Sequence, residues 1–520
     1  MACHYYFIAS RALSRQGLIL TQQHTFLWHD YETFGADPTR DRPCQFAALR
    51  TDAQLEPLGE PVTWFAQPAD DYLPAPEACL ITGITPQRAL AEGEPEALFM
   101  QRVLQLMSEP GTCVVGYNSL SFDDEVTRFS AWRNLFDPYA REWQNGNSRF
   151  DLINVVRMAK ALRPEGINWP ENEQGRASFR LEHLTAANGI EHSAAHDAMA
   201  DVNATLALAR LLRSAQPKLF DWALKLRDKR FVQAQLMPCF TTAFLHFGAE
   251  YGAERNCTAL LVPLAIHPQQ KGCIVCFDLN TEPDTLLAES SDRLLELMYL
   301  PEAQLGVNGK RPGLVQLKCN RVPMLAPVAI LKTLPAARVA ELLPQLDAMR
   351  RRMKVLQANR TLVEQKVAEI YRKERGQALC SEAESSLYNG GFLSSDDRQK
   401  LDGFRDGLFA LASGGEPATA ASTDLNRLKF SDERLADLCL RFKARNFSEM
   451  LTEAEHARWS NYRLQRLQHG ADNRTLTLDT YFQALEALAV QHKMDAGKIE
   501  ILEELKIYGE ALVDEIEPEY

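Results

Sequence analysis

Two acidic residues near the start of the chain, Asp30 and Glu32, have the type and spacing of a metal-binding pair. They lie in residues 25–32, whose apolar and aromatic composition predicts a β-strand. Side chains two positions apart on a strand point to the same face, so both carboxylates project together. Neighbouring carboxylates repel each other unless a cation offsets their charge, and Mg²⁺ or Mn²⁺ prefers oxygen ligands. Taken alone, such a pair is more often a solvated strand edge.

A third acid, Asp123, ends the run NSLSFD at residues 118–123, which follows a predicted strand at residues 112–117. Phe122 can enter the core while Asp123 stays at the turn into the next helix. Taken alone, Asp123 is better explained as a helix cap that accepts backbone N–H groups.

A histidine and a fourth acid occur together in the run HDAMAD, residues 196–201. Small and apolar residues at helical spacing follow up to residue 212 and predict a closely packed helix. An unpaired Asp201 inside such a helix would be costly, whereas His196 falls in the preceding loop or first turn, which suits proton transfer. A lone histidine is more often a packed or surface residue.

The elements that must position these residues form an α/β pattern. Strands are predicted at residues 25–32, 45–50, 61–66 and 112–117, and helices at 94–107, 124–132 and 152–161. This order predicts a sheet domain that ends near Arg213, followed by a linker at residues 214–217.

The remainder of the chain changes character. Strands are predicted at residues 259–265, 272–279 and 314–319, helices at 336–371, 432–442, 453–467 and 478–509, and an exposed loop at 412–423. We therefore expect a small, mostly β domain followed by a helical one.

Composition limits the possible functions. The chain has 520 residues, of which 46% are hydrophobic, and its 57 Lys and Arg against 69 Asp and Glu give a net charge of −12. The composition is globular, and no apolar run is long enough to span a membrane. A nucleic-acid role would need a local basic groove on an acidic protein.

Cysteine usage indicates a reducing compartment, and we expect a cytoplasmic protein. The 11 cysteines are scattered rather than arranged as a disulfide framework. Cys273 and Cys276 lie in a β-rich stretch whose alternation places them on opposite faces. Buried strand cysteines are thus favoured over a zinc site with Cys239 or Cys257.

Taken together, the four acids and His196 resemble the exonuclease superfamily with four acidic ligands and a histidine (DEDDh), whose sheet is of the ribonuclease H type. Further stretches resemble bacterial exonuclease I, namely residues 29–35, 41–43, 68–74, 80–86, 122–128, 161–170, 178–184 and 444–447. The resemblance begins near His24 and continues, more weakly after Arg213, almost to the end of the chain.

The resemblance implies an α/β fold in three parts that close a groove over single-stranded DNA. These are a ribonuclease H-like exonuclease domain at residues 24–213, a small Src-homology-3-like β-barrel at 214–358 and a helical domain at 359–520. Residues 1–23, with Arg11 and Arg15 but no acid, depart from the family pattern. A flexible extension is favoured there over an organelle transit peptide.

The resemblance also implies a mechanism. Asp30, Glu32, Asp123 and Asp201 would hold two Mg²⁺ ions, or Mn²⁺, around the scissile phosphate, and His196 would act as general base for the attacking water. Single-stranded DNA would be degraded processively from its 3′ end to 5′ mononucleotides.

Substrate contacts follow from the same resemblance. Glu32, Arg128 and Arg180 are the expected substrate contacts, and further stacking or backbone contacts are expected from Tyr139, Trp143, Arg157 and Phe179. Core packing is an equal alternative for each aromatic residue. Basic clusters at residues 225–230, 318–321 and 350–354 line the DNA path or form solvated faces.

The expected partner is the acidic C-terminal tail of single-stranded DNA-binding protein, and the expected roles are in recombination and repair, with the protein as a monomer. Two alternatives stay open: an RNA-degrading or proofreading exonuclease with the same metal site, and a catalytically idle single-strand-binding scaffold.

Overall fold

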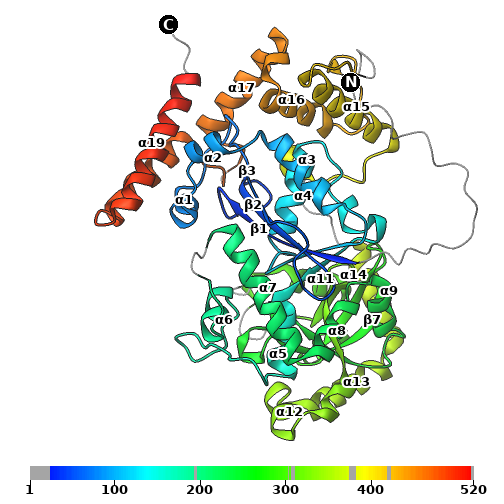
Figure 1. Cartoon of the computed structure of the whole chain (residues 1–520). Helices are drawn as coiled ribbons and strands as arrows, with labels where there is room; N and C mark the ends of the chain where they lie inside the picture. Colours follow the sequence, from blue (N-terminus) through cyan, green and yellow to red (C-terminus); the bar gives the residue numbers. More distant parts are fainter. Residues whose placement is uncertain are drawn as a thin grey trace, which may run out of the picture.

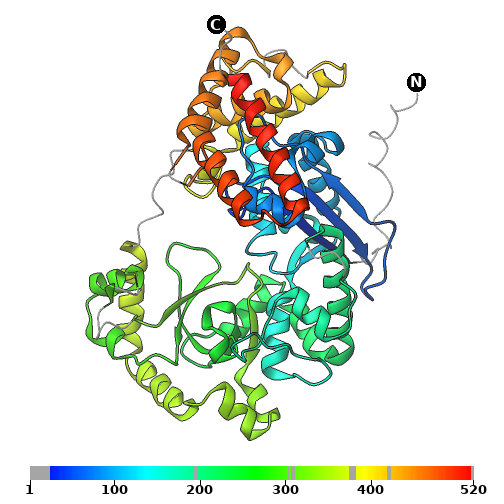
Figure 2. The ribbon, with the colours of Figure 1, turned by 90° about the vertical axis from the view of Figure 1, so that its left-hand side faces the viewer.

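The computed structural model describes residues 24–192, 196–301, 304–305, 311–373, 382–417, 423–472 and 474–516. The predicted extension at residues 1–23 and part of the predicted 412–423 loop lie outside these ranges. Two sheets and a group of helices make up the molecule (Figure 1). Figures 1 and 2 show the C-terminal helices and the second sheet at opposite ends of the first sheet. Among the described residues, none of the helices has the length and apolarity needed to cross a bilayer.

The first sheet is mixed and has the order β3-β2-β1-β4-β5. Its strands are β1 (Thr25–Thr33), β2 (Pro43–Thr51), β3 (Val62–Phe65), β4 (Thr112–Gly116) and β5 (Ser148–Asp151). β1 is antiparallel to β2 and parallel to β4, and β5 continues parallel to β4. The predicted strands are confirmed, and β5 is an addition that the sequence pattern did not reveal.

Helices cover both faces of this sheet. Successive side chains of β1 point alternately to one face and to the other. Leu27 and Tyr31 pack against α3 (Glu96–Met107) and α4 (Asp123–Arg133). Phe26 and Trp28 face the opposite layer, which is formed by α5 (Leu152–Leu162) and α7 (Ala198–Ala215). Asp30 and Glu32 continue the Phe26–Trp28 face, so their carboxylates point toward α7.

Three short helices complete this part of the chain, α1 (Pro76–Thr82), α2 (Pro86–Glu92) and α6 (Leu181–Ala187). The predicted linker at residues 214–217 is wrong. α7 ends at Ala215, α8 (Pro217–Lys225) begins two residues later, and the two helices pack together. Proline is favoured at the first position of a helix, where its missing N–H costs nothing, so Pro217 starts a helix there instead of breaking the structure.

The second sheet is antiparallel, with the order β10-β6-β7-β8-β9. Its strands are β6 (Phe244–Phe247), β7 (Thr258–Ile266), β8 (Cys273–Asp278), β9 (Leu314–Lys318) and β10 (Met324–Pro327). Cys273 and Cys276 are buried free thiols on β8, as expected.

More helices surround the second sheet than its predicted mostly β character implied. They are α8, α9 (Lys229–Leu236), α10 (Asp284–Ala288), α11 (Ser291–Tyr299), α12 (Ala336–Leu342), α13 (Leu346–Ala358) and α14 (Arg360–Lys373). The prediction placed residue 359 at the start of the helical domain, but α14 contacts β7, α10 and α11. Its Val363, Val367 and Ile370 are buried in the same core as the second sheet.

The C-terminal helices are α15 (Ser395–Ala412), α16 (Arg434–Asn446), α17 (Glu453–His469), α18 (Leu478–Gln491) and α19 (Ala496–Ile516). The single helix predicted over 478–509 is in fact α18 and α19, which pack against each other. α15 and α16 pack against Phe129 and Trp132 of α4, and α18 and α19 pack against the region of α1.

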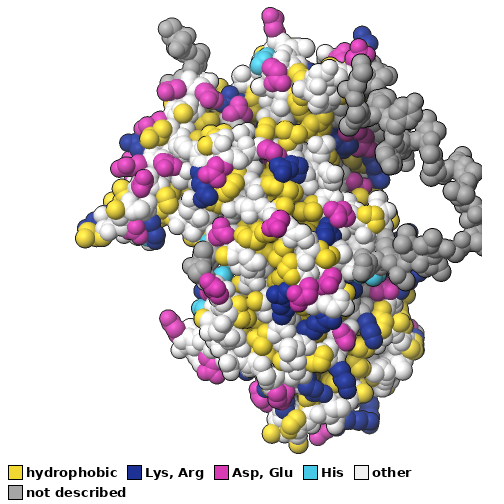
Figure 3. All heavy atoms as spheres, viewed as in Figure 1, with side chains coloured by type: hydrophobic (Ala, Val, Ile, Leu, Met, Phe, Trp, Pro, Cys, Tyr) yellow, Lys and Arg dark blue, Asp and Glu magenta, His cyan; other side chains and the backbone are white. Residues whose placement is uncertain are grey.

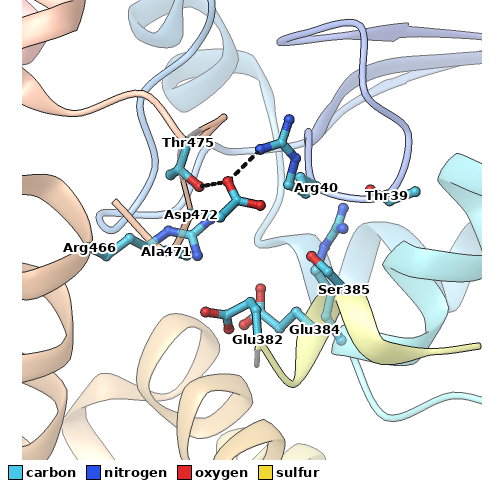
Figure 4. Close-up of a pocket in the computed structure, with 10 residues that line it drawn as sticks. Thr39, Arg40, Glu382, Glu384, Ser385, Arg466, Ala471, Asp472 and Thr475 are labelled. Carbon is cyan, nitrogen blue, oxygen red and sulfur yellow. Dashed lines mark hydrogen bonds and ion pairs between the residues drawn. The ribbon is translucent and has the colours of Figure 1, made fainter. Parts of the chain in front are cut away.

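Buried ion pairs join the C-terminal helices to the first sheet domain. Asp71 is fully buried and accepts two hydrogen bonds from Arg445, at 2.8 and 2.7 Å, and its backbone oxygen accepts one from Arg466. Nearby, Asp472 accepts hydrogen bonds from Arg40 of the first domain and from Thr475 (Figure 4). These contacts fix the helical domain to the loop between β1 and β2, which carries Arg40, and to the segment between β3 and α1, which carries Asp71.

Candidate active site

Three carboxylates converge where β1 meets α7. Oxygen atoms of Asp30, Glu32 and Asp201 lie within 4.8 Å of one another. Asp30 and Glu32 come from one face of β1, and Asp201 comes from the first turn of α7, which packs on β1 and β2. The predicted grouping of these residues is therefore present in the structure.

Asp123 approaches the same place from α4, of which it is the first residue. Its Oδ1 accepts a hydrogen bond from the N–H of Tyr31, at 3.2 Å, so the carboxylate lies beside the strand between Asp30 and Glu32. The sequence alone favours a helix-cap role for Asp123. The bond to Tyr31 shows that the carboxylate is directed to β1.

Burial and mutual repulsion disfavour ionisation of this cluster. Burial, and then the charges of Asp201 and Asp123, raise the pKa of Glu32 to about 8. Burial raises the pKa of Asp123 to about 8 as well, and burial with the three other acids raises the pKa of Asp30. Asp197, which caps α7, adds further negative charge. A divalent cation would relieve this repulsion, and four convergent carboxylates are the hard oxygen ligands that Mg²⁺ and Mn²⁺ prefer.

Two histidines lie beside Asp201. The expected general base, His196, is exposed, has a φ of 70°, and lies two residues before α7, next to its N-cap Asp197. Its backbone N–H and charge both favour the ionised form of Asp201. The second histidine, His192, is not among the residues predicted from the sequence. Its Nε2 lies 2.5 Å from Oδ1 of Asp201, and its Nδ1 lies 3.3 Å from Oγ1 of Thr185. The signal that could have found it is a second histidine four residues before His196.

An open pocket of about 410 Å³ adjoins the acids. Its lining includes Asp30, Tyr117, Asn118, Ile153, Arg157, Phe179, Arg180, Leu181, Glu182, His192, His196 and Asp201. The side chain of Arg180 is 72% exposed, and Arg157 stacks over the ring of Phe179 at 5.8 Å. The guanidinium of Arg180 lies 3.5 Å from the carboxylate of Glu182, which is also in the lining. The pocket thus combines acids, histidines, an exposed arginine and an aromatic face, which are groups that can bind divalent cations, phosphates and bases.

Family models match nearly all of the chain. A model described as Exonuclease matches residues 27–208, one described as Exonuclease I SH3-like domain matches 227–373, and one described as Exonuclease I C-terminal domain matches 381–512. Exodeoxyribonuclease I of Escherichia coli is 42% identical over 494 residues, which cover 95% of this chain and 99% of the relative. This chain belongs to the exonuclease I family. It is an enzyme, and its acid cluster lies within the exonuclease match.

Solved structures of the exonuclease I family have the same fold. E. coli exonuclease I in complex with a dA16 oligonucleotide superimposes with a TM-score of 0.85 at 41% identity and covers 94% of this chain and all of that one. A zinc-bound E. coli complex with single-stranded DNA and an SSB/exonuclease I structure with an inhibitor give TM-scores of 0.84 and 0.83, at 41% and 40% identity. They cover 95% and 94% of this chain and all of those chains. The predicted three-part exonuclease I fold is confirmed.

The other expected DNA contacts of this family member lie away from the acid pocket. Tyr139 and Trp143 line a separate, mostly apolar pocket between α4 and the C-terminal domain, and Trp143 is 66% exposed. Arg128 lies over the Tyr139 ring but is buried and bonded to two acids. Its guanidinium donates two hydrogen bonds to Glu142, at 2.7 and 3.0 Å, and one to Glu125, at 2.8 Å. Arg128 therefore ties α4 to its neighbours and is not presented to solvent as a free phosphate contact.

Some arginines of the predicted basic clusters at residues 318–321 and 350–354 also bind other parts of the protein. Arg321 reaches from the second domain to Glu125, at 3.0 Å, and Arg352 is buried against the backbone oxygens of Leu279 and Asn280. Lys and Arg side chains are interspersed with acidic ones over the second domain in the face shown in Figure 3. This distribution agrees with a protein of net negative charge whose positive charge acts locally.

Proposed function

We propose that this protein degrades single-stranded DNA processively from the 3′ end, releases 5′ mononucleotides, and acts in DNA repair and recombination. The observation that carries the proposal is the convergence of Asp30, Glu32 and Asp201 beside an open pocket. Asp30, Asp201 and Arg180 are part of the lining of that pocket. The relatives crystallised with single-stranded oligonucleotides support DNA as the substrate.

The residues have separate roles in this proposal. Asp30, Glu32, Asp123 and Asp201 hold two Mg²⁺ ions, for which Mn²⁺ can substitute. Divalent ions bound there supply the charge that lowers the pKa of water and stabilises the leaving 3′ oxygen. His196 accepts the proton of the attacking water, because it is exposed at the pocket edge and free of the ion pair that occupies His192.

The remaining pocket residues bind the end of the strand. Arg180 offers its charge to a phosphate, and the Phe179 ring, which Arg157 backs, offers a face for stacking a base. In this proposal Glu32, which lies beside Asp30 and Asp201, contacts the terminal nucleotide as well as an ion. Trp143 and Tyr139 extend the binding surface toward the C-terminal domain.

The acidic C-terminal tail of single-stranded DNA-binding protein is the proposed partner, supported by the solved SSB/exonuclease I complex. We place the protein in the cytoplasm, since its described cysteines are free thiols, as a reducing compartment requires. We also propose that it acts as a monomer.

The test is degradation of a 5′-labelled single-stranded oligonucleotide with Mg²⁺, comparing the wild-type protein with Asp30→Ala. A duplex, a strand blocked at its 3′ end and an RNA of the same sequence are run in parallel. The proposal expects a ladder that shortens from the free 3′ end of DNA and is absent in the variant and in EDTA. Preferential cleavage of RNA, or salt-sensitive binding with no cleavage, would overturn it.

A further inference from the structure

Asp151 is a buried acid that the proposed metal site does not use. It is the last residue of β5, where its register partner is Gly116, the last residue of the parallel strand β4. Carboxyl ends of parallel strands meet at one edge of a sheet, so Asp151 lies at the same edge as the pocket. Its side chain is enclosed, with the residue only 2% exposed.

The oxygens of Asp151 are occupied by backbone N–H groups. Oδ1 accepts from Asn118, at 2.9 Å, and from Ile153, at 3.1 Å, and Oδ2 accepts from Leu120, at 3.2 Å. Burial raises the pKa of Asp151 to about 6 and the three N–H groups oppose that rise, so the carboxylate is ionised at neutral pH. A buried carboxylate with this many donors is satisfied without a metal ion.

Two of these bonds, from Asn118 and Leu120, hold the loop at residues 118–122, which leads from β4 to Asp123. The third, from Ile153, caps the start of α5. Asn118 has a φ of 62°, a left-handed conformation that side chains other than glycine adopt at a cost. The loop is folded tightly onto the strand end, since a Cβ on Gly116 would lie 2.5 Å from Cβ of Ser119. A strained, tight loop persists only where its surroundings impose it.

The consequence for the active site follows from the chain path. α4 begins with Asp123 immediately after the loop, and the carboxylate of Asp123 is aimed at β1 by its bond to Tyr31. Asn118 itself lines the pocket with Asp30. Any change in the loop therefore moves an acid of the cluster relative to the two on β1.

We infer that Asp151 is a positioning residue that fixes the 118–122 loop and thereby sets the place of Asp123 in the metal site. The inference rests on the proposed metal-dependent activity and assigns no ligand role to Asp151. It predicts that the geometry of the Asp151 carboxylate, and not only its charge, determines metal affinity.

The test measures Mn²⁺ binding without DNA, by electron paramagnetic resonance of free Mn²⁺, in Asp151→Asn and Asp151→Glu. In Asp151→Asn one carboxylate oxygen is replaced by an NH₂ group, which donates and cannot accept a hydrogen bond. At least one of the backbone N–H groups that Asp151 binds therefore loses its acceptor. Asp151→Glu keeps the charge but displaces the oxygens by one methylene. Asp397→Asn is the matched control, because Asp397 is a buried carboxylate in the C-terminal domain whose two oxygens both accept hydrogen bonds from Ser431.

Both variants are expected to weaken Mn²⁺ binding about tenfold, as removal of groups that orient ligands does, with Asp397→Asn unchanged. Binding of a single-stranded oligonucleotide in EDTA should stay within about twofold of wild type, since Arg180 and Phe179 are untouched. Should Asp151→Asn fail to fold, which its melting curve shows, the charge-retaining Asp151→Glu carries the test.

Two results would overturn the inference: unchanged Mn²⁺ affinity in both variants, or loss in Asp151→Asn with wild-type affinity in Asp151→Glu, which would mean that charge alone matters. A wild-type protein that neither binds Mn²⁺ nor cleaves DNA is a different outcome, because it contradicts the proposed function and not the role of the loop.

Discussion

Asp71→Asn tests how the C-terminal helices are held on the nuclease domain. The side chain of Asp71 is fully buried and forms a two-bond pair with Arg445 of α16, while Arg466 of α17 bonds its backbone oxygen. Removing one partner of a buried ion pair costs about 3–5 kcal/mol, because the other charge is left without compensation. Glu384 still contacts Arg445, at 2.6 Å, so we expect the lower end, about 3 kcal/mol.

Hydrogen exchange of the α16 and α17 amides is the assay, because it reports local opening of this domain. A loss of about 3 kcal/mol accelerates exchange through that opening by roughly 100-fold. Asp437→Asn is the control, since Asp437 pairs with Arg458 between the same two helices but at 3.6 Å and in solvent. That exposed pair should contribute less than about 1 kcal/mol. Exchange in Asp71→Asn within about threefold of the control would refute the reasoning.

Acid adds a second check on the same interface. Burial opposes ionisation of Glu384, but Arg445 and Arg42 outweigh it and lower the pKa of Glu384 to about 2. The pKa of Asp71 is lowered by Arg445 and Arg466 despite its burial. A carboxyl group whose pKa is lower in the folded than in the unfolded protein stabilises the fold at any pH above its unfolded pKa. That stabilisation is lost as the pH falls from the unfolded pKa to the folded pKa. Protection of α16 and α17 should therefore decline from about pH 4.5 down to about pH 2.

Three further predictions concern the active site. Arg180→Gln should weaken the binding of single-stranded DNA in EDTA, measured by fluorescence anisotropy. The slope of log affinity against log salt concentration should become shallower by about 0.7, because one phosphate contact is lost. An unchanged slope would mean that Arg180 does not contact a phosphate. The pKa values of Glu32 and Asp123 are raised to about 8, so a bound metal ion must displace protons from these carboxyl groups. The apparent Mn²⁺ affinity, measured by calorimetry, should therefore increase from about pH 6 to pH 8. An affinity that does not change with pH would contradict this. Gly116→Ala should lower stability by about 1–3 kcal/mol in thermal unfolding, because its Cβ would collide with Ser119; a neutral result would show that the loop yields easily.

The acids could be found from the sequence because local periodicity places them. Alternation along β1 puts Asp30 and Glu32 on one face, and helical spacing puts Asp201 on the first turn of a helix that packs there. Both inferences need only neighbouring residues. The family resemblance then supplied the three-part fold, which no local pattern contains.

The parts that were missed depend on contacts between distant segments. Arg128 stands in a family-like motif, yet its partner Glu142 lies 14 residues away and removes it from solvent. His192 meets Asp201 only because the loop before α7 folds back onto the helix. The pair between Asp71 and Arg445 spans 374 residues, a separation that no periodicity reveals.

The central claim is hydrolysis of the terminal phosphodiester by water at the four-acid site. It is tested most directly by degrading single-stranded DNA in ¹⁸O-labelled water with Mg²⁺ and analysing the products by mass spectrometry. The account predicts 5′ mononucleotides from the 3′ end, each with one ¹⁸O atom in its 5′ phosphate, and none with Asp30→Ala. Products with a 3′ phosphate, internal fragments as the first products, or equal release by Asp30→Ala would contradict it.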